Sequence, residues 1–144
     1  MKTLINLISG QTIPNLIAQK YIKPDKTILL YSKGSIKQKD NYKNVITQSD
    51  IEEYQVEAFD FFGISKCIEK IIDQYKRNDI ILNFTCGTKI MSLASFEVFR
   101  NTGHLSIYID SENNKIYKYK NNHCESEIIQ IKIILITNFF SFLK

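Results

Sequence analysis

The chain has 144 residues, of which 44% are hydrophobic and 24% charged, so it can form about one domain with a real core and is too apolar to be disordered. Its net charge of +4 suits an anionic ligand but is too small and too dispersed for a general nucleic-acid-binding protein, and we expect no direct DNA binding. The three cysteines, Cys67, Cys86 and Cys124, lack the spacing of a disulfide framework or a zinc site, so we expect no metal, no cofactor and a reducing, cytoplasmic location.

Neither end of the chain indicates secretion or membrane insertion. The first apolar run is interrupted by Asn6, is too short for a signal peptide and lacks a small-residue cleavage site. The apolar stretch at 128–143 contains Gln130, Lys132 and Asn138, and it is too short and too polar for a membrane span. We therefore expect no membrane partner.

Hydrophobic periodicity predicts strands alternating with helices through most of the chain. In chain order the predicted elements are a strand at 3–8, a helix at 12–22, a strand at 27–31, a helix within 33–50, a strand at 54–59, a helix at 64–76, a strand at 79–84, a helix at 88–100 and a strand at 105–109. This alternation predicts an α/β, Rossmann-like fold with a mainly parallel sheet flanked by helices. The short connection at 110–114 leads to a strand at 116–119, which predicts an antiparallel C-terminal hairpin.

Two polar turns follow strands and open directly into helices. The strand at 3–8 leads into Ser9-Gly10-Gln11-Thr12, and the strand at 79–84 leads into Thr85-Cys86-Gly87-Thr88-Lys89. At a helix start the backbone N–H groups are unpaired and the helix dipole is positive, which favours phosphate. If the two strands are parallel neighbours, both turns meet outside their carboxyl ends. The sequence therefore predicts an anion site built from both turns.

A simpler interpretation is that Ser9, Thr12, Thr85 and Thr88 only cap helices, as Ser and Thr often do. Two common nucleotide-binding motifs are absent, because the chain contains neither G-x-x-x-x-G-K-[ST] nor G-x-G-x-x-G. An NTPase or a dehydrogenase is therefore not indicated.

Three other side chains have chemistry that needs an interpretation. His104 and His123 have no carboxylate pair at ligand spacing beside them, which is typical of surface or hydrogen-bonded histidines rather than catalytic bases. Cys86 lies next to a helix start, where a thiol pKa can be lowered, but the sequence offers no basic partner. A nucleophilic role for Cys86 is therefore not favoured.

Segments 4–15 and 83–94 together resemble the two ligand-binding signatures of CARF (CRISPR-associated Rossmann fold) domains, in particular the branch fused to restriction-endonuclease-like nucleases in type III CRISPR systems. The resemblance covers residues 2–120, and its T-x-G-T-K core is rather specific. It implies a homodimer that binds a cyclic oligoadenylate second messenger, with cyclic tetra-adenylate favoured, as a sensor or a sink in antiviral signalling. The ligand-binding residues that it implies are Ser9, Gly10, Gln11, Thr12, Thr85, Cys86, Gly87, Thr88 and Lys89.

The chemistry of these residues fits such a ligand. A ring of four nucleotides has four phosphates and can be two-fold symmetric, so each chain of a dimer would supply one half of the site. Gln11 is a candidate for amide contacts to a base. Tyr31 or Tyr108 could stack on a base, although packing is the commoner role of such aromatic residues.

The chain departs from the family pattern at two places. Cys86 stands where the family commonly has Gly, so a positive φ there would strain the turn. No nuclease domain follows, so we expect a CARF-like domain at 1–122 and a C-terminal extension at 123–144. Residues 128–144 of that extension could be an extra strand, a helix packed on the dimer, or the remnant of a lost fusion.

The alternative activity is that of a stand-alone ring nuclease. In that reaction a ribose 2′-OH of the ring attacks the neighbouring phosphorus and leaves linear products with a 2′,3′-cyclic phosphate. No metal is required if the pocket enforces in-line geometry, with Ser9 and Thr88 orienting the sugar and phosphate and Lys89 offsetting the developing charge. No general base is evident, so we expect slow cleavage. A regulator acting only through protein contacts is a third possibility that the sequence neither supports nor excludes.

Overall fold

The computed structural model describes residues 1–46 and 48–132. Within these residues one sheet contains seven strands, β1 (Lys2–Leu7), β2 (Lys26–Tyr31), β3 (Asp50–Gln55), β4 (Asp79–Asn83), β5 (Leu105–Asp110), β6 (Lys115–Lys120) and β7 (His123–Ile128). The helices are α1 (Ile13–Ile22), α2 (Ile36–Val45), α3 (Phe61–Gln74) and α4 (Lys89–Phe99), and a short 3₁₀ helix, η1 (Lys33–Ser35), precedes α2. The Rossmann-like fold with its antiparallel C-terminal hairpin is therefore confirmed.

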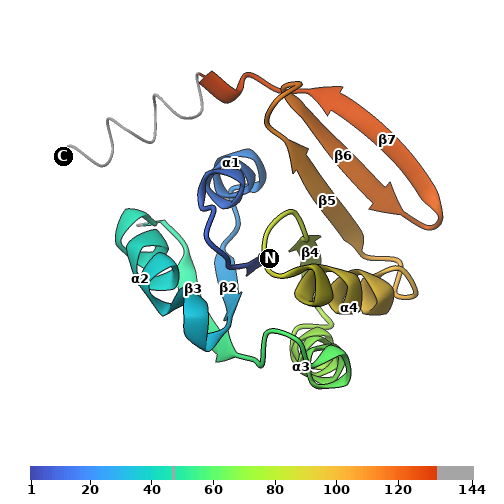
Figure 1. The fold of residues 1–144 in the computed structure, drawn as a ribbon. Helices are drawn as coiled ribbons and strands as arrows, with labels where there is room; N and C mark the ends of the chain where they lie inside the picture. The colour runs from blue at the N-terminus through green and yellow to red at the C-terminus, as the bar shows by residue number, and fades with distance from the viewer. Residues whose placement is uncertain (47, 133–144) are drawn as a thin grey trace.

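The strand order is β3-β2-β1-β4-β5-β6-β7, with β1 to β5 parallel and β6 and β7 antiparallel (Figure 1). The chain moves outward from β1 to β3 and then crosses to the other side of β1 to form β4. Such a reversal of strand order opens a crevice outside the carboxyl ends of the two central strands, which is where ligands bind in open α/β sheets. The two polar turns follow β1 and β4, the strands on either side of this reversal.

Helices cover both faces of the sheet, α3 and α4 on one and α1 and α2 on the other (Figure 1). On α3, Ile64, Ile68 and Ile71 follow helical spacing and pack in one buried cluster with Ile5 and Leu7 of β1. Residues 3–7 of β1 are all buried, because a central parallel strand is covered on both faces.

The third strand was expected at 54–59 but lies at Asp50–Gln55. It is the edge strand, and its acidic side chains bind lysines of neighbouring elements. Lys26 Nζ is 3.0 Å from Glu52 Oε2, and Lys39 Nζ is 3.1 Å from Glu53 Oε1. Because the first half of this strand is rich in acidic residues, its hydrophobic pattern is weak. The predicted strand therefore begins four residues too late and extends into the following loop.

The last strand, β7, was not predicted as a separate element. Its side chains are all exposed, so it has no hydrophobic alternation. The signal that could have found it is the Asn121-Asn122 turn, in which both residues have positive φ (51° and 60°), as a two-residue type I′ hairpin turn requires. The boundary at residue 122 between a CARF-like domain and a C-terminal extension stays a prediction. Residues 133–144, which make up most of the apolar tail, lie outside the described residues. Among the described residues no helix is both long and apolar enough to cross a membrane.

Candidate functional site

The turn after β1 is exposed at its tip. Gly10 and Gln11 are exposed, and Ser9 is half-buried. Thr12 occupies the N-cap position of α1, yet its side chain makes no capping hydrogen bond. A proline in the first turn, Pro14, favours the helical backbone there instead. The capping interpretation is therefore wrong for Thr12, whose hydroxyl group the helix does not use.

The turn after β4 is held by its own threonines. The Thr88 hydroxyl accepts a hydrogen bond from the Met91 N–H (3.1 Å), so the capping interpretation is confirmed at this position, and it donates to the Ala58 carbonyl (2.6 Å). The Thr85 hydroxyl donates to Asn83 Oδ1 (2.6 Å) and accepts from the Ile109 N–H (2.8 Å). Each hydroxyl gives its single proton to the protein, so neither can donate to a ligand while these bonds persist.

The left-handed position of this turn is Gly87, with φ of +87°, and Cys86 is not among the described residues with positive φ. The condition for strain at Cys86, a positive φ, is therefore not met. The thiol pKa is not lowered by the nearby helix start either. Burial raises the pKa of Cys86 to about 11, although a hydrogen bond with the Ser9 side chain acts in the opposite direction. Cys86 is a buried, protonated thiol and not a nucleophile.

The two turns lie against each other. A Cβ atom on Gly87 would stand 3.0 Å from Cβ of Leu7, the last residue of β1, so the second turn packs directly on the end of the first strand. The Ser9 side chain of the first turn also lies near the Cys86 thiol of the second turn and acts to lower its pKa. The expectation that both turns meet outside the carboxyl ends of two parallel neighbouring strands is therefore confirmed.

A buried polar network that the sequence analysis missed lies below the two turns. Asn83 Nδ2 donates to Asn6 Oδ1 (3.0 Å) and to Asn15 Oδ1 (3.1 Å). Asn6 Nδ2 donates to the Tyr42 hydroxyl (2.7 Å), and Asn15 Nδ2 donates to the Leu7 carbonyl (3.0 Å). All four polar side chains are at most 1% exposed, and burial raises the pKa of Tyr42 well above its usual range.

This network fixes β1, α1, α2 and β4 relative to one another. Asn83 also accepts from the backbone N–H and the hydroxyl of Thr85 (3.2 and 2.6 Å), so the network continues into the second turn. A fully satisfied buried polar network specifies one arrangement, because any displacement leaves polar groups unpaired in a low dielectric. The available signal was asparagine inside two otherwise apolar strands, at positions 6 and 83.

Two surface hollows flank the second turn. The first, which we call the loop hollow, has a volume of about 450 Å³ and is lined by residues 8–10, 32–35, 57–59 and 88, from the loops that follow β1 to β4. The second, the α4 hollow, has a volume of about 350 Å³ and is lined by Phe84, Thr85, Gly87, Lys89, Ser92, Leu93, Phe96 and Tyr108.

The expected ligand-binding residues divide between these hollows. Ser9, Gly10 and Thr88 line the loop hollow, and Thr85, Gly87 and Lys89 line the α4 hollow. Gln11 and Thr12 line neither, and Cys86 is buried between the turns. Lys89 is exposed at the first position of α4, where the helix leaves backbone N–H groups without intrahelical acceptors.

The two aromatic candidates for stacking have different surroundings. Tyr31 is half-buried, and Lys39 Nζ lies 4.7 Å from the centre of its ring, so Tyr31 belongs to the packing between β2 and α2. Tyr108 is 40% exposed on β5 and lines the α4 hollow, where its ring centre is 5.7 Å from that of Phe84.

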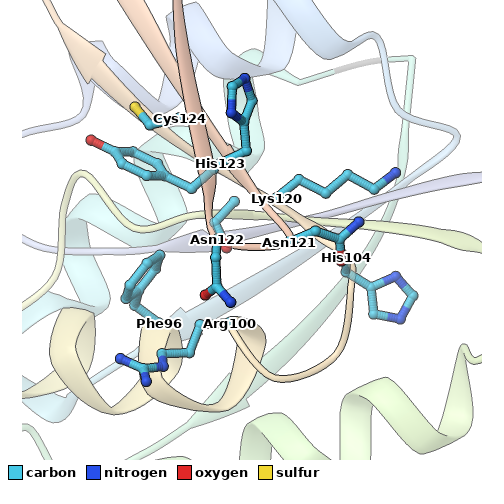
Figure 2. Close-up of a pocket in the computed structure, with 10 residues that line it drawn as sticks. Phe96, Arg100, His104, Lys120, Asn121, Asn122, His123 and Cys124 are labelled. Atoms are coloured by element: carbon cyan, nitrogen blue, oxygen red, sulfur yellow. The ribbon is translucent and has the colours of Figure 1, made fainter.

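A third hollow, of about 240 Å³, lies at the other end of α4 and is shown in Figure 2. It contains the basic side chains Arg100, His104, Lys120 and His123, but those of Arg100, His104 and Lys120 extend in different directions (Figure 2). Partial burial, with a contribution from Lys120, lowers the pKa of His104, so its ring is uncharged at neutral pH. No group of three or more potential metal ligands occurs in the described part of the chain. Because these basic side chains do not converge on a common point, the third hollow is not the candidate ligand site.

The fold and the paired turns define a Rossmann-like domain in which two polar turns meet at the reversal of strand order. The chain belongs to the Card1 CARF domain family, whose model matches residues 3–138. A search of curated proteins found no significant match.

Three solved structures have the same fold. Can2 from Sulfobacillus thermosulfidooxidans, in complex with cyclic tetra-adenylate, has a TM-score of 0.81 and 30% identity over 90% of this chain and 37% of its own. VC1899 from Vibrio cholerae has a TM-score of 0.78 and 11% identity over 90% of this chain and 36% of its own. Csm6 from Enterococcus italicus, bound to cyclic hexa-2′-fluoro-hexa-dAMP, has a TM-score of 0.59 and 16% identity over 95% of this chain and 43% of its own. The last two show the fold alone, and this chain spans less than half of each matched protein.

Proposed function

We propose that this domain binds a cyclic oligoadenylate, with cyclic tetra-adenylate favoured, in a site shared by two copies of the chain. The single observation that carries the proposal is that two turns separated by more than 70 residues meet at the reversal of strand order. The proposal is supported by Can2, which is 30% identical over 90% of this chain and was solved with cyclic tetra-adenylate. On this basis the protein acts in the cytoplasm as a sensor or a sink in type III CRISPR antiviral signalling.

The charge distribution fits a phosphate ring. Lys89 is exposed, and it stands beside the free N–H groups and the positive dipole end of α4. A cyclic tetranucleotide has four phosphates and can be two-fold symmetric, so two copies of this helix start would contact it in equivalent ways.

The exposed apolar surface next to Lys89 supports a dimer. Leu93 is 60% exposed on α4 and Tyr108 is 40% exposed on β5, and both line the α4 hollow with Phe84 and Phe96. A second copy packed against this surface would cover it and bring two copies of Lys89 to one ligand.

The proposal is tested by titrating the protein with labelled cyclic tri-, tetra- and hexa-adenylate. Lys89→Ala removes a charge-assisted contact in each half-site, at a cost of about 1.5–3 kcal/mol each, so binding should weaken at least a hundred-fold. Lys70→Ala, an exposed lysine of α3, is the matched control and should bind normally. Calorimetry should give one ring for two chains. Unchanged affinity for Lys89→Ala removes that residue from the site, and one ring per chain contradicts the shared site.

The same mixtures test ring cleavage, the alternative activity. In that reaction a ribose 2′-hydroxyl loses its proton and its oxygen bonds to phosphorus, while the bond from phosphorus to the 5′-oxygen breaks and that oxygen takes up a proton. The products end in a 2′,3′-cyclic phosphate. Ser9 remains a candidate to orient the ribose, because it lines the loop hollow. Thr88 is less suited to this role, since its proton is bound to the Ala58 carbonyl. Cleavage that persists in EDTA supports a ring nuclease, and an intact ring after hours with protein in excess leaves the sensor or sink.

A further inference from the structure

The loop between β3 and α3 carries an exposed aromatic side chain at the edge of the loop hollow. Phe59 is 80% exposed and lines the hollow. Phe62, in the first turn of α3, is exposed to a similar extent (76%) but does not line it. An exposed phenylalanine leaves apolar area in water that contributes nothing to the stability of the isolated domain. The fold does not use the Phe59 ring, which is therefore free to contact a ligand in the hollow.

The chemistry of the loop hollow differs from that of the start of α4. Its charged residues are Lys33 and Glu57, and its other polar residues are serines and a threonine. Glu57 forms no ion pair within the described residues. A carboxylate repels phosphate but accepts hydrogen bonds from an amino group. Lys33 balances the charge of Glu57, so the hollow has no net charge among its lining residues and suits an uncharged, hydrogen-bond-donating group better than a phosphate.

The hollow also has free space on its two glycine-containing sides. A Cβ atom added to Gly10 or Gly34 would meet no heavy atom within 4 Å, and neither glycine has positive φ. Thr88 lines this hollow and the next residue, Lys89, lines the α4 hollow. One nucleotide could therefore place its base in the loop hollow and its phosphate at the start of α4.

We propose that the loop hollow is the nucleoside-binding half of the site, in which the Phe59 ring stacks on a purine base and the Glu57 carboxylate accepts a hydrogen bond from the amino group of that base. This inference rests on the proposed function, since it assigns parts of the same ligand to different residues. It makes Glu57 the residue that distinguishes adenine from a base without an amino group, whereas Phe59 adds affinity through stacking. Neither polar turn can recognise a base through phosphate contacts alone.

The stacking part is tested with Phe59→Ala, Phe59→Tyr and Phe62→Ala and with labelled cyclic tetra-adenylate, in which every base keeps the amino group that Glu57 contacts. Stacking on an aromatic side chain is expected to change affinity by about ten- to a hundred-fold. We expect Phe59→Ala to lose that factor and Phe59→Tyr, which keeps an aromatic ring, to recover most of it. Phe62→Ala should bind like the unmodified protein. All three variants should melt at the same temperature, because both side chains are exposed.

The hydrogen-bonding part is tested with Glu57→Gln and two rings, cyclic tetra-adenylate and cyclic tetra-inosinate. Inosine lacks the amino group and presents an acceptor instead, so the unmodified protein should prefer the adenylate ring about ten-fold or more. An amide can donate as well as accept, so Glu57→Gln should narrow that preference. Normal affinity in Phe59→Ala together with normal base preference in Glu57→Gln overturns this inference. Absence of ring binding by the unmodified protein overturns the proposed function itself.

Discussion

Asn83→Asp tests whether the buried amide network holds the two turns in place. The substitution keeps the shape of the side chain and both bonds that Thr85 donates to its oxygen. It replaces the amide nitrogen that donates to Asn6 Oδ1 and Asn15 Oδ1 with an acceptor. Asn15 cannot compensate by rotating its amide, because its nitrogen is bound to the Leu7 carbonyl. Asn6 could do so only if the Tyr42 hydroxyl turned its proton away from the Asn15 carbonyl, which would break another buried bond.

Asn83→Asp should destabilise the protein because Asn6 Oδ1 and Asn15 Oδ1, two buried oxygens, lose their donor. Each unsatisfied buried group costs about 1–3 kcal/mol, so the free energy of unfolding should fall by about 2–6 kcal/mol. Burial raises the pKa of the introduced carboxyl group in the folded state, so the unfolded state releases the proton first as pH increases. The stability of the variant should therefore decrease from pH 5 to pH 8, while that of the unmodified protein changes less over this range.

Urea denaturation followed by circular dichroism at pH 5 and pH 8 measures both effects. Asn41→Asp, at an exposed position of α2, is the matched control and should change the free energy of unfolding by less than about 0.5 kcal/mol. If Asn83→Asp unfolds within 0.5 kcal/mol of the unmodified protein at pH 8, the network does not stabilise the turns and this reasoning is wrong. Ring binding should weaken in the same variant, because both turns depend on Asn83.

Three further predictions concern single residues. Cys86, which is buried with a pKa raised to about 11, should resist a thiol reagent at pH 8 until the protein unfolds, whereas the exposed Cys124 should react at once. Mass spectrometry of the labelled peptides measures both reactions, and rapid labelling of Cys86 in the folded protein would contradict the prediction. Gly87→Ala should lower the free energy of unfolding by about 1–3 kcal/mol, because φ is +87° and the new Cβ would stand 3.0 Å from Cβ of Leu7. Gly10→Ala is the control and should have little effect, so equal melting temperatures for the two variants would contradict this prediction. Hydrogen bonds from Lys43 and Lys39 lower the pKa of Glu53. The protein should therefore be more stable than Glu53→Gln by up to about 1 kcal/mol above about pH 4.3, and this difference should disappear as pH falls below that value. Urea titrations of both proteins at pH 7 and pH 3 measure the difference.

The candidate site was predictable where its chemistry depends on local sequence. The two turns were identified because each follows an apolar strand and precedes a helix, and both features are visible within about ten residues. The hydroxyl groups of Thr85 and Thr88 could not be assigned from the sequence, because their partners, Ile109 and Ala58, lie 24 and 30 residues away. Phe59 was missed for the same reason, since nothing near it indicates that its loop borders the turn after β1.

The sequence by itself determined the alternation of strands and helices, the parallel core, the C-terminal hairpin and the two polar turns, because periodicity and turn chemistry act over neighbouring residues. Only the tertiary structure decided the edge position of β3, the buried Asn6–Asn83 pairing and the division of the turn residues between two hollows. The physical reason is that burial and hydrogen-bond partners depend on groups distant in the chain. Cys86 shows this most directly, since its position next to a helix start favours a lowered thiol pKa, whereas its burial between the two turns raises that pKa.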